Sequence, residues 1–311
     1  MSSMPWQDDA WRRLQARRER GALPHALLVC GPEGLGKRDF ADRFVRGLLC
    51  QQPEQGEACG HCRSCALLDA GTHPDRVAVG YGLRKDGVQR SEIVIDQVRE
   101  LSARLAMASQ FGGWQVATID PADALNAAAA NALLKTLEEP AAQTMLVLVA
   151  DAPWRLPQTI RSRCQRIEFH LPEPAEALAW LQAGGVADPA SALQAAGGNP
   201  GLARRWAEEG ALERRREVRR DLAALAAGRG EATEVVRRWL DSEPAQRVWF
   251  AAQAVADECR ARAGGEAGPL ASALDEAALA DWYGRANRTR ESLRGPLRND
   301  LVLLELLARW R

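Results

Sequence analysis

The sequence contains no uninterrupted apolar stretch of the ~18 or more residues that a membrane-spanning helix requires. Its first residues, Met1 to Asp9, also lack a basic segment followed by an apolar one, so they do not resemble a secretory signal. These absences predict a cytoplasmic protein with no membrane partner. In that reducing compartment, the seven cysteines are not expected to form a disulfide framework.

The chain also lacks net charge, because 41 Lys and Arg residues balance 41 Asp and Glu residues. A protein whose main task is to coat nucleic acid is usually basic, so that function class is disfavoured. With 46% apolar and 26% charged residues, the composition is typical of a folded globular chain rather than a disordered one. A length of 311 residues allows two or three domains, each with its own core.

The first half of the chain alternates strand and helix patterns. Apolar runs predict strands at 26–30, 114–120, 145–150 and 166–170. Helical patterns are predicted at 40–49, 96–105, 123–139 and 159–161, whereas residues 91–95 fit either a short strand or a loop. Asp96 and Asp123 are the expected N-caps of the second and third of these helices. This alternation predicts a parallel sheet covered by helices on both faces.

The character of the sequence changes near residue 170, after which every pattern is helical. We therefore predict three domains, with boundaries near 170 and near 207. Residues 1–170 form an α/β domain with a cysteine-rich insert at 50–65, residues 171–207 a small helical domain, and residues 208–311 an all-helical domain.

A glycine-rich turn separates the first predicted strand from the helix that follows it. Gly31, Gly34, Gly36 and Lys37 have the spacing G-x-x-x-x-G-K, in which backbone N–H groups converge on phosphate oxygens and the lysine reaches the β and γ phosphates. Arg38 stands where this motif has the Ser or Thr that binds Mg²⁺. The pattern indicates descent from a phosphate-binding loop and makes ATP binding doubtful, and a plain glycine turn is the alternative.

A second acidic motif would be expected where the strand at 114–120 ends. Asp120 is suited to hold a metal ion through water, but Pro121 stands where ATPases of this architecture carry the glutamate that polarises the attacking water. Asp123 is a candidate substitute for that base, although we favour its role as an N-cap.

Cys50, Cys59, Cys62 and Cys65 follow the pattern C-x8-C-x2-C-x2-C. Two overlapping C-x2-C turns with a fourth cysteine suit tetrahedral Zn²⁺ bound by thiolates. Because four thiolates fill such a site, the zinc would be structural rather than catalytic. The alternatives are His61 in place of one cysteine, an iron–sulfur cluster or a redox pair.

Three further stretches complete a family resemblance. They are Gly-Thr-His-Pro-Asp at 71–75, Asn-Ala-Leu-Leu-Lys-Thr-Leu-Glu-Glu-Pro at 131–140, and Arg-Ser-Arg-Cys at 161–164. With the phosphate loop and the cysteines, they resemble bacterial sliding-clamp-loader subunits of the AAA+ class over residues 20–207. The resemblance implies an AAA+ domain, a helical lid and a helical collar for oligomerisation.

The resemblance also implies a mechanism and partners. Five subunits, among them motor subunits of the gamma/tau type and a delta subunit, would form a partial ring that loads a sliding clamp onto primed DNA. ATP would lie at the subunit interfaces. Arg163, the arginine of Ser-Arg-Cys, would act as an arginine finger on the neighbouring motor subunit's ATP. Glu138 and Glu139, by contrast, are expected to pack at a contact rather than to form a paired-carboxylate active site.

Three departures from the hydrolysing relatives predict a subunit with no intrinsic ATPase activity. Arg38 replaces a hydroxyl, Pro121 replaces a glutamate, and Gly201 occupies the position of a sensor arginine, with Arg204 three residues later. The alternatives are an ATP-hydrolysing motor subunit of the gamma/tau type and a stand-alone P-loop kinase or small NTPase.

Overall fold

The computed structural model describes residues 4–84, 86–293 and 298–310. The chain divides into two compact units, Met1–Glu176 and Ala177–Arg311. The division of the second half into a small domain at 171–207 and a larger one at 208–311 stays a prediction.

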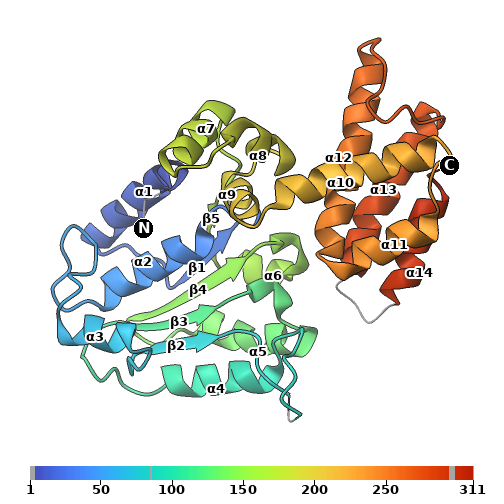
Figure 1. Ribbon diagram of the computed structural model, residues 1–311. Coiled ribbons are helices and arrows are strands. Elements are labelled where there is room, and N and C mark those ends of the chain that lie inside the picture. Colours follow the sequence, from blue (N-terminus) through green and yellow to red (C-terminus); the bar gives the residue numbers. More distant parts are fainter. Residues whose placement is uncertain (1–3, 85, 294–297, 311) are drawn as a thin grey trace. The chain divides into compact units, whose positions relative to one another are not determined.

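The first unit contains a five-stranded sheet in the order β2-β3-β4-β1-β5, in which every pairing is parallel (Figure 1). Its strands are β1 Ala26–Cys30, β2 Arg76–Val79, β3 Gln115–Ile119, β4 Thr144–Ala150 and β5 Gln165–Glu168. The predicted parallel sheet is confirmed. The strand β2 was not predicted, because it lies at the end of the cysteine-rich segment, where the apolar pattern is short.

The register of the central strands positions the candidate site. Cys30 at the end of β1 pairs with Ala150 at the end of β4, and Ile119 at the end of β3 pairs with Leu148. The residues that follow these three strands therefore meet at one edge of the sheet, the carboxyl edge. In open α/β sheets, this is the edge at which ligands bind.

Helices cover both faces of the sheet (Figure 1). The helices α1 Asp8–Glu19, α2 Lys37–Leu49 and α3 Arg63–Asp69 contribute residues such as Leu14, Phe40 and Leu68 to one apolar core. The helices α4 Ile95–Leu105, α5 Ala127–Glu138 and α6 Gln158–Arg161 contribute residues such as Leu101, Leu133 and Ile160 to the other. Because β4 is buried along its whole length, it presents apolar side chains to both cores.

Two of the predicted N-caps were wrong. The helix α4 is capped by Val94 rather than Asp96, and the Gln97 side chain accepts the Val94 N–H at 3.0 Å. Residues 122–124 form a 3₁₀ turn, and α5 begins only at Ala127, where the Asn126 side chain accepts the Ala129 N–H at 2.9 Å. Residues 91–94 form a loop with a bridge from Ile93 to Leu125, and Ile95 is already the first residue of α4.

The rest of the chain is helical, as predicted. Its helices are α7 Pro174–Ala183, α8 Pro189–Ala195, α9 Pro200–Glu208, α10 Ala211–Ala226, α11 Ala232–Asp241, α12 Pro244–Ala263, α13 Glu276–Ser292 and α14 Asn299–Ala308. Trp239, Trp282 and Trp310 are the largest fully buried side chains of this second unit. The indole of Trp310 donates to the Leu222 carbonyl at 2.8 Å, which joins α10 to the residues after α14.

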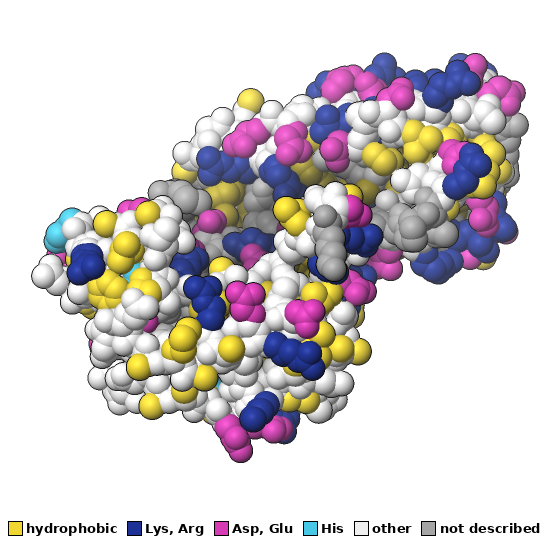
Figure 2. Space-filling model, turned by 90° about the horizontal axis from the view of Figure 1, so that it is seen from below, with side chains coloured by type: hydrophobic (Ala, Val, Ile, Leu, Met, Phe, Trp, Pro, Cys, Tyr) yellow, Lys and Arg dark blue, Asp and Glu magenta, His cyan; other side chains and the backbone are white. Residues whose placement is uncertain are grey.

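The surface of the helical unit carries charges of both signs. Figure 2 shows basic and acidic side chains interspersed over it on the face in view. Several of them form ion pairs within one helix, such as Arg216 with Glu213 at 2.8 Å. Among the helices that the structure describes, none is both long enough and apolar enough to cross a bilayer.

Candidate functional site

The glycine-rich loop runs from the end of β1 to the start of α2. Gly31, Gly34 and Gly36 have φ values of +138°, +86° and +72°, which L-residues with side chains rarely adopt. A Cβ atom on Gly31 would also collide with the Phe169 carbonyl oxygen. The predicted strand–turn–helix context of the loop is therefore present.

The Lys37 side chain is buried and already has partners. Its Nζ lies 2.6 Å from Asp151 Oδ1 and donates to the Pro32 carbonyl at 2.6 Å, and the side chain is only 1% exposed. The ammonium group therefore faces a carboxylate and a carbonyl of its own chain.

The Arg38 guanidinium bridges two carboxylates at the carboxyl edge of the sheet. Its Nε donates to Asp120 Oδ2 at 2.9 Å, and its Nη2 donates to Asp151 Oδ2 at 2.9 Å. Burial alone would raise the pKa of Asp151, but hydrogen bonds from Arg38 and Lys37 outweigh this effect and lower it. Asp151 is therefore ionised at neutral pH.

Asp123 is engaged with the backbone, so it is not placed to act as a general base. Its two carboxylate oxygens accept the N–H groups of Asp151 and Ala152, each at 3.2 Å. This contact orients the segment that carries Asp151. Sequence reasoning missed Asp151, although a carboxylate directly after a fully buried parallel strand is a usable signal for a residue at the carboxyl edge.

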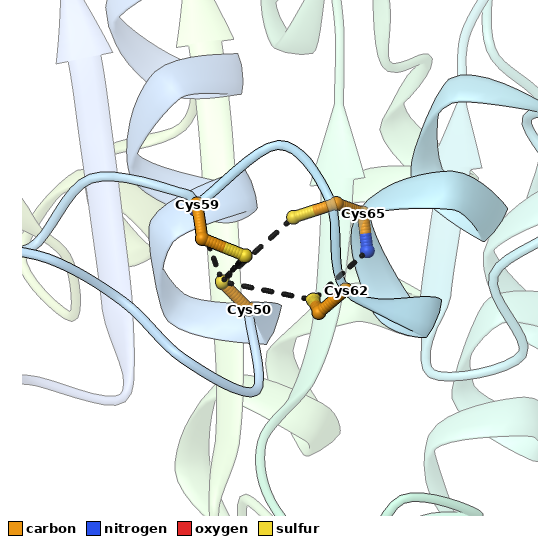
Figure 3. A group of neighbouring side chains, drawn as sticks. All are labelled: Cys50, Cys59, Cys62 and Cys65. Carbon is orange, nitrogen blue, oxygen red and sulfur yellow. Dashed lines mark hydrogen bonds between the residues drawn. The ribbon is translucent and has the colours of Figure 1, made fainter.

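The four cysteines form a second cluster, as predicted (Figure 3). Their sulfur atoms all lie within 4.8 Å of one another. Cys50 Sγ is 3.5 Å from the sulfur of Cys59, 3.8 Å from that of Cys62 and 3.7 Å from that of Cys65. In a tetrahedral site with metal–sulfur bonds of about 2.3 Å, sulfurs lie about 3.8 Å apart, so the residues fit a bound metal ion.

Backbone N–H groups donate to two of these sulfurs, and the thiol pKa of Cys62 is lowered, whereas burial raises the pKa of the Cys50 and Cys65 thiols. The Cys59 N–H donates to Cys50 Sγ at 3.3 Å, and the Cys65 N–H donates to Cys62 Sγ at 3.4 Å. Burial raises the pKa of the Cys62 thiol, but hydrogen bonds from backbone N–H groups and neighbouring thiols outweigh it and lower the pKa to about 6. The Arg18 guanidinium interacts electrostatically with Cys50.

Two neighbours of the cysteines have other roles than those considered from the sequence. His61 is exposed, its Nδ1 contacts the Cys59 carbonyl at 2.9 Å, and it lies outside the metal-suited group of four cysteines. Arg63, the first residue of α3, lies over the Phe111 ring at 5.8 Å.

A buried hydrogen-bond chain anchors the cysteine segment to the sheet. Nδ1 of His73 accepts the Asp75 N–H at 3.2 Å, so Nε2 carries the proton and donates to Ser64 Oγ at 2.8 Å. The Ser64 hydroxyl in turn donates to the Leu49 carbonyl at 2.6 Å. Because His73 donates to Ser64, it does not activate that hydroxyl as a nucleophile, and the chain is structural.

Arg163 lies between α6 and β5 and is half-exposed. Its Nη1 donates to the Thr159 carbonyl at 2.9 Å, and its Nη2 lies 2.7 Å from Glu138 Oε1 at the end of α5. The side chain is 37% exposed, so the guanidinium is oriented by its own chain yet open on one side. The sequence predicted only packing for Glu138, and its contact with Arg163 was missed.

The other candidate arginines differ from Arg163. Arg161 is only partly exposed, and its Nε is buried without a hydrogen-bond partner among the described residues. In α9, Arg204 pairs with Glu208 at 3.1 Å and lies over the Trp180 ring at 5.6 Å. Gly201, the residue at the sensor position, lies in the first turn of the same helix.

Comparison with known proteins identifies relatives of this chain. Residues 6–173 match the family described as DNA polymerase III, delta subunit. The chain is 39% identical over 239 residues to DNA polymerase III subunit delta' of Pseudomonas aeruginosa, which covers 76% of this chain and 70% of that one. It is 38% identical over 203 residues to the subunit delta' of Escherichia coli, covering 64% of this chain and 59% of that relative.

Among solved structures, a gamma subunit-related DNA polymerase III protein of Thermotoga maritima aligns with a TM-score of 0.46. The sequences are 18% identical, and the alignment covers 98% of this chain and 100% of that chain.

The anchoring role of His73 is testable by substitution. His73→Ala leaves the buried Ser64 hydroxyl without its donor and removes the ring that packs on Phe111 at 5.0 Å. We expect the free energy of unfolding to fall by about 1–3 kcal/mol in urea denaturation of the metal-replete protein. The matched control is His61→Ala, which should change it by less than about 0.5 kcal/mol because His61 is exposed. Equal losses in the two variants would contradict the role.

Proposed function

Because the chain belongs to the DNA polymerase III delta-prime family, we propose that it is a clamp-loader subunit that hydrolyses no ATP itself. Instead, it would place an arginine side chain in the ATP site of a neighbouring subunit. In this role it would assist the loading of a sliding clamp onto primed DNA in the cytoplasm. The observation that carries the proposal is the half-exposed Arg163 guanidinium, held at the edge of a domain in which neither Pro121 nor Asp123 is placed to act as a general base.

The contacts of Arg163 support donation to a neighbouring subunit. A guanidinium is always charged and presents several N–H donors in one plane, which suits phosphate oxygens. The Thr159 carbonyl and Glu138 restrict its orientation, and the exposed side remains available to an acceptor outside the chain. Transfer to the triphosphate of a motor subunit would replace the Glu138 carboxylate by phosphate oxygens, an exchange of one charge-assisted contact for another.

The chain's own carboxyl edge supports the absence of hydrolysis. Pro121 cannot accept a proton, and Asp123 already accepts two backbone N–H groups. General base catalysis needs a group within hydrogen-bond reach of the attacking water, and neither residue supplies one. These features disfavour the alternative of a motor subunit of the gamma/tau type.

The partners we propose follow from the family. They are motor subunits of the gamma/tau type and a delta subunit, in a five-membered assembly joined through the helical collar at 208–311. The residues at 171–207 would form the lid. The sliding clamp and primed DNA would be reached through that assembly.

The metal we propose for the cysteine cluster is Zn²⁺. Four thiolates with tetrahedral spacing and N–H···S hydrogen bonds are the donor set that Zn²⁺ prefers in structural sites. The ion would hold the segment from Cys50 to Cys65 against α1 and α2, where Arg18 donates to the carbonyls of Gly56 and Gly47 at 3.1 and 2.8 Å.

Hydrolysis by the isolated chain is the first test. We expect no release of inorganic phosphate from ATP above the blank, with or without DNA, because neither Pro121 nor Asp123 is placed to polarise the attacking water. A steady turnover that co-purifies with the chain through two chromatographic steps would contradict the proposal.

The Arg163→Ala variant tests the donated arginine. In the assembled complex, the rate of ATP hydrolysis at the site that receives Arg163 should fall by about 10³-fold or more. The DNA-stimulated hydrolysis that remains should then come from the other ATP sites of the complex. Arg166→Ala is the matched control, since Arg166 is 43% exposed and is also paired, with Glu168. Assembly is checked by size-exclusion chromatography. Unchanged turnover in an intact Arg163→Ala complex refutes the assignment.

The metal content tests the cysteine cluster. Protein purified without chelator should contain about one Zn²⁺ per chain, measured by inductively coupled plasma mass spectrometry, as one site of four thiolates requires. Cys62→Ser should lower this content, whereas Cys259→Ser, a change at a cysteine outside the cluster, should not. A zinc content near zero in the unmodified chain would remove the metal from the proposal.

A further inference from the structure

The positive charges of the phosphate loop are already neutralised by carboxylates of the same chain. Lys37 and Arg38 supply two positive charges, and Asp120 and Asp151 supply two negative charges, all joined by contacts of 2.6–2.9 Å. A loop that binds a nucleoside triphosphate instead needs uncompensated positive charge, from the lysine and from a divalent cation. The loop therefore offers no excess positive charge to a phosphate.

The Arg38 guanidinium lies beside the carboxylates that would otherwise hold a divalent cation. In the full motif, the residue after the lysine carries the hydroxyl that binds Mg²⁺, and the acidic residue after β3 holds the same ion. Here that residue is an arginine, and its guanidinium contacts that acidic residue, Asp120, as well as Asp151. A bound Mg²⁺ would compete with the guanidinium for the same carboxylates.

The position of Lys37 adds a second obstacle. A triphosphate would have to take the ammonium group from Asp151, which lies 2.6 Å away, and from the Pro32 carbonyl. Asp151 would then keep only Arg38 as its cation and would face the incoming phosphates as a like charge. The residues present therefore do not fit a magnesium-bound nucleotide.

We propose that Arg38 is a built-in replacement for the divalent cation, and that it closes an otherwise intact phosphate loop to magnesium-bound nucleoside triphosphates. The backbone of the loop keeps the conformation that phosphate binding requires, with Gly34 and Gly36 at positive φ and Lys37 at the start of α2. In Arg38→Ser, Mg²⁺ can take the place of the guanidinium beside Asp120 and Asp151, which frees the Lys37 ammonium for the phosphates, so this single change should reopen the site. This inference concerns the chain's own loop, and it goes beyond the role of Arg163.

The test titrates the full-length chain with magnesium-bound ATP by isothermal titration calorimetry, with the slowly hydrolysed analogue ATPγS as a second probe. The unmodified chain should show no binding at millimolar nucleotide. Arg38→Ser should gain affinity by at least about tenfold, the gain should require Mg²⁺, and a second change, Lys37→Ala, should abolish it. Arg38→Thr repeats the test with the other hydroxyl residue of the motif, in case the serine variant is poorly folded.

Arg38→Lys is the matched control, because it keeps the charge but cannot bridge two carboxylates with a planar fork and supplies no hydroxyl for Mg²⁺. It should not gain magnesium-dependent binding. Tight binding of magnesium-bound ATP by the unmodified chain overturns the proposal, and so does a folded Arg38→Ser or Arg38→Thr variant that gains no affinity. Since none of these measurements involves partner subunits, their outcome is distinct from that of the Arg163→Ala experiment.

Discussion

The guanidinium of Arg38 bridges two carboxylates at the carboxyl edge of the sheet, and the function that we propose for the chain depends on this bridge. It joins Asp120 at the end of β3 to Asp151 at the end of β4, and Lys37 completes the group from the start of α2. An edge that in a motor subunit would serve a nucleotide and a metal ion is here neutralised by the chain's own side chains. In the proposed role, the chain then acts on ATP only where another subunit holds the nucleotide, through Arg163.

The same sheet positions both the phosphate loop, which follows β1, and Arg163, which precedes β5. The strands β1 and β4 are central and buried, so the residues that follow them cannot shift without breaking the core. Arg163 lies just before the edge strand β5, where one side of its guanidinium remains exposed. Burial of the Lys37 side chain and partial exposure of Arg163 are consistent with this strand order.

Local sequence patterns were enough to predict part of this structure. Apolar periodicity located β1, β3, β4 and β5, and the cysteine spacing predicted a cluster that the fold forms. The contacts that close the phosphate loop were not predictable in the same way, because Arg38 and Asp151 are 113 residues apart and meet only through the sheet order. The contact of Glu138 with Arg163 was missed for the same reason, and the start of α5 was misplaced because Asp123 caps the backbone after β4 instead of a helix.

The most direct measurement is a structure of the assembled complex with a non-hydrolysable ATP analogue. The Arg163 guanidinium should have left Glu138 and should lie within about 3 Å of a phosphate oxygen in the neighbouring subunit, with Arg38 still between Asp120 and Asp151. A structure in which Arg163 stays on Glu138 beside a filled neighbouring site, or in which a nucleotide occupies the loop from Gly31 to Lys37, would contradict this assignment.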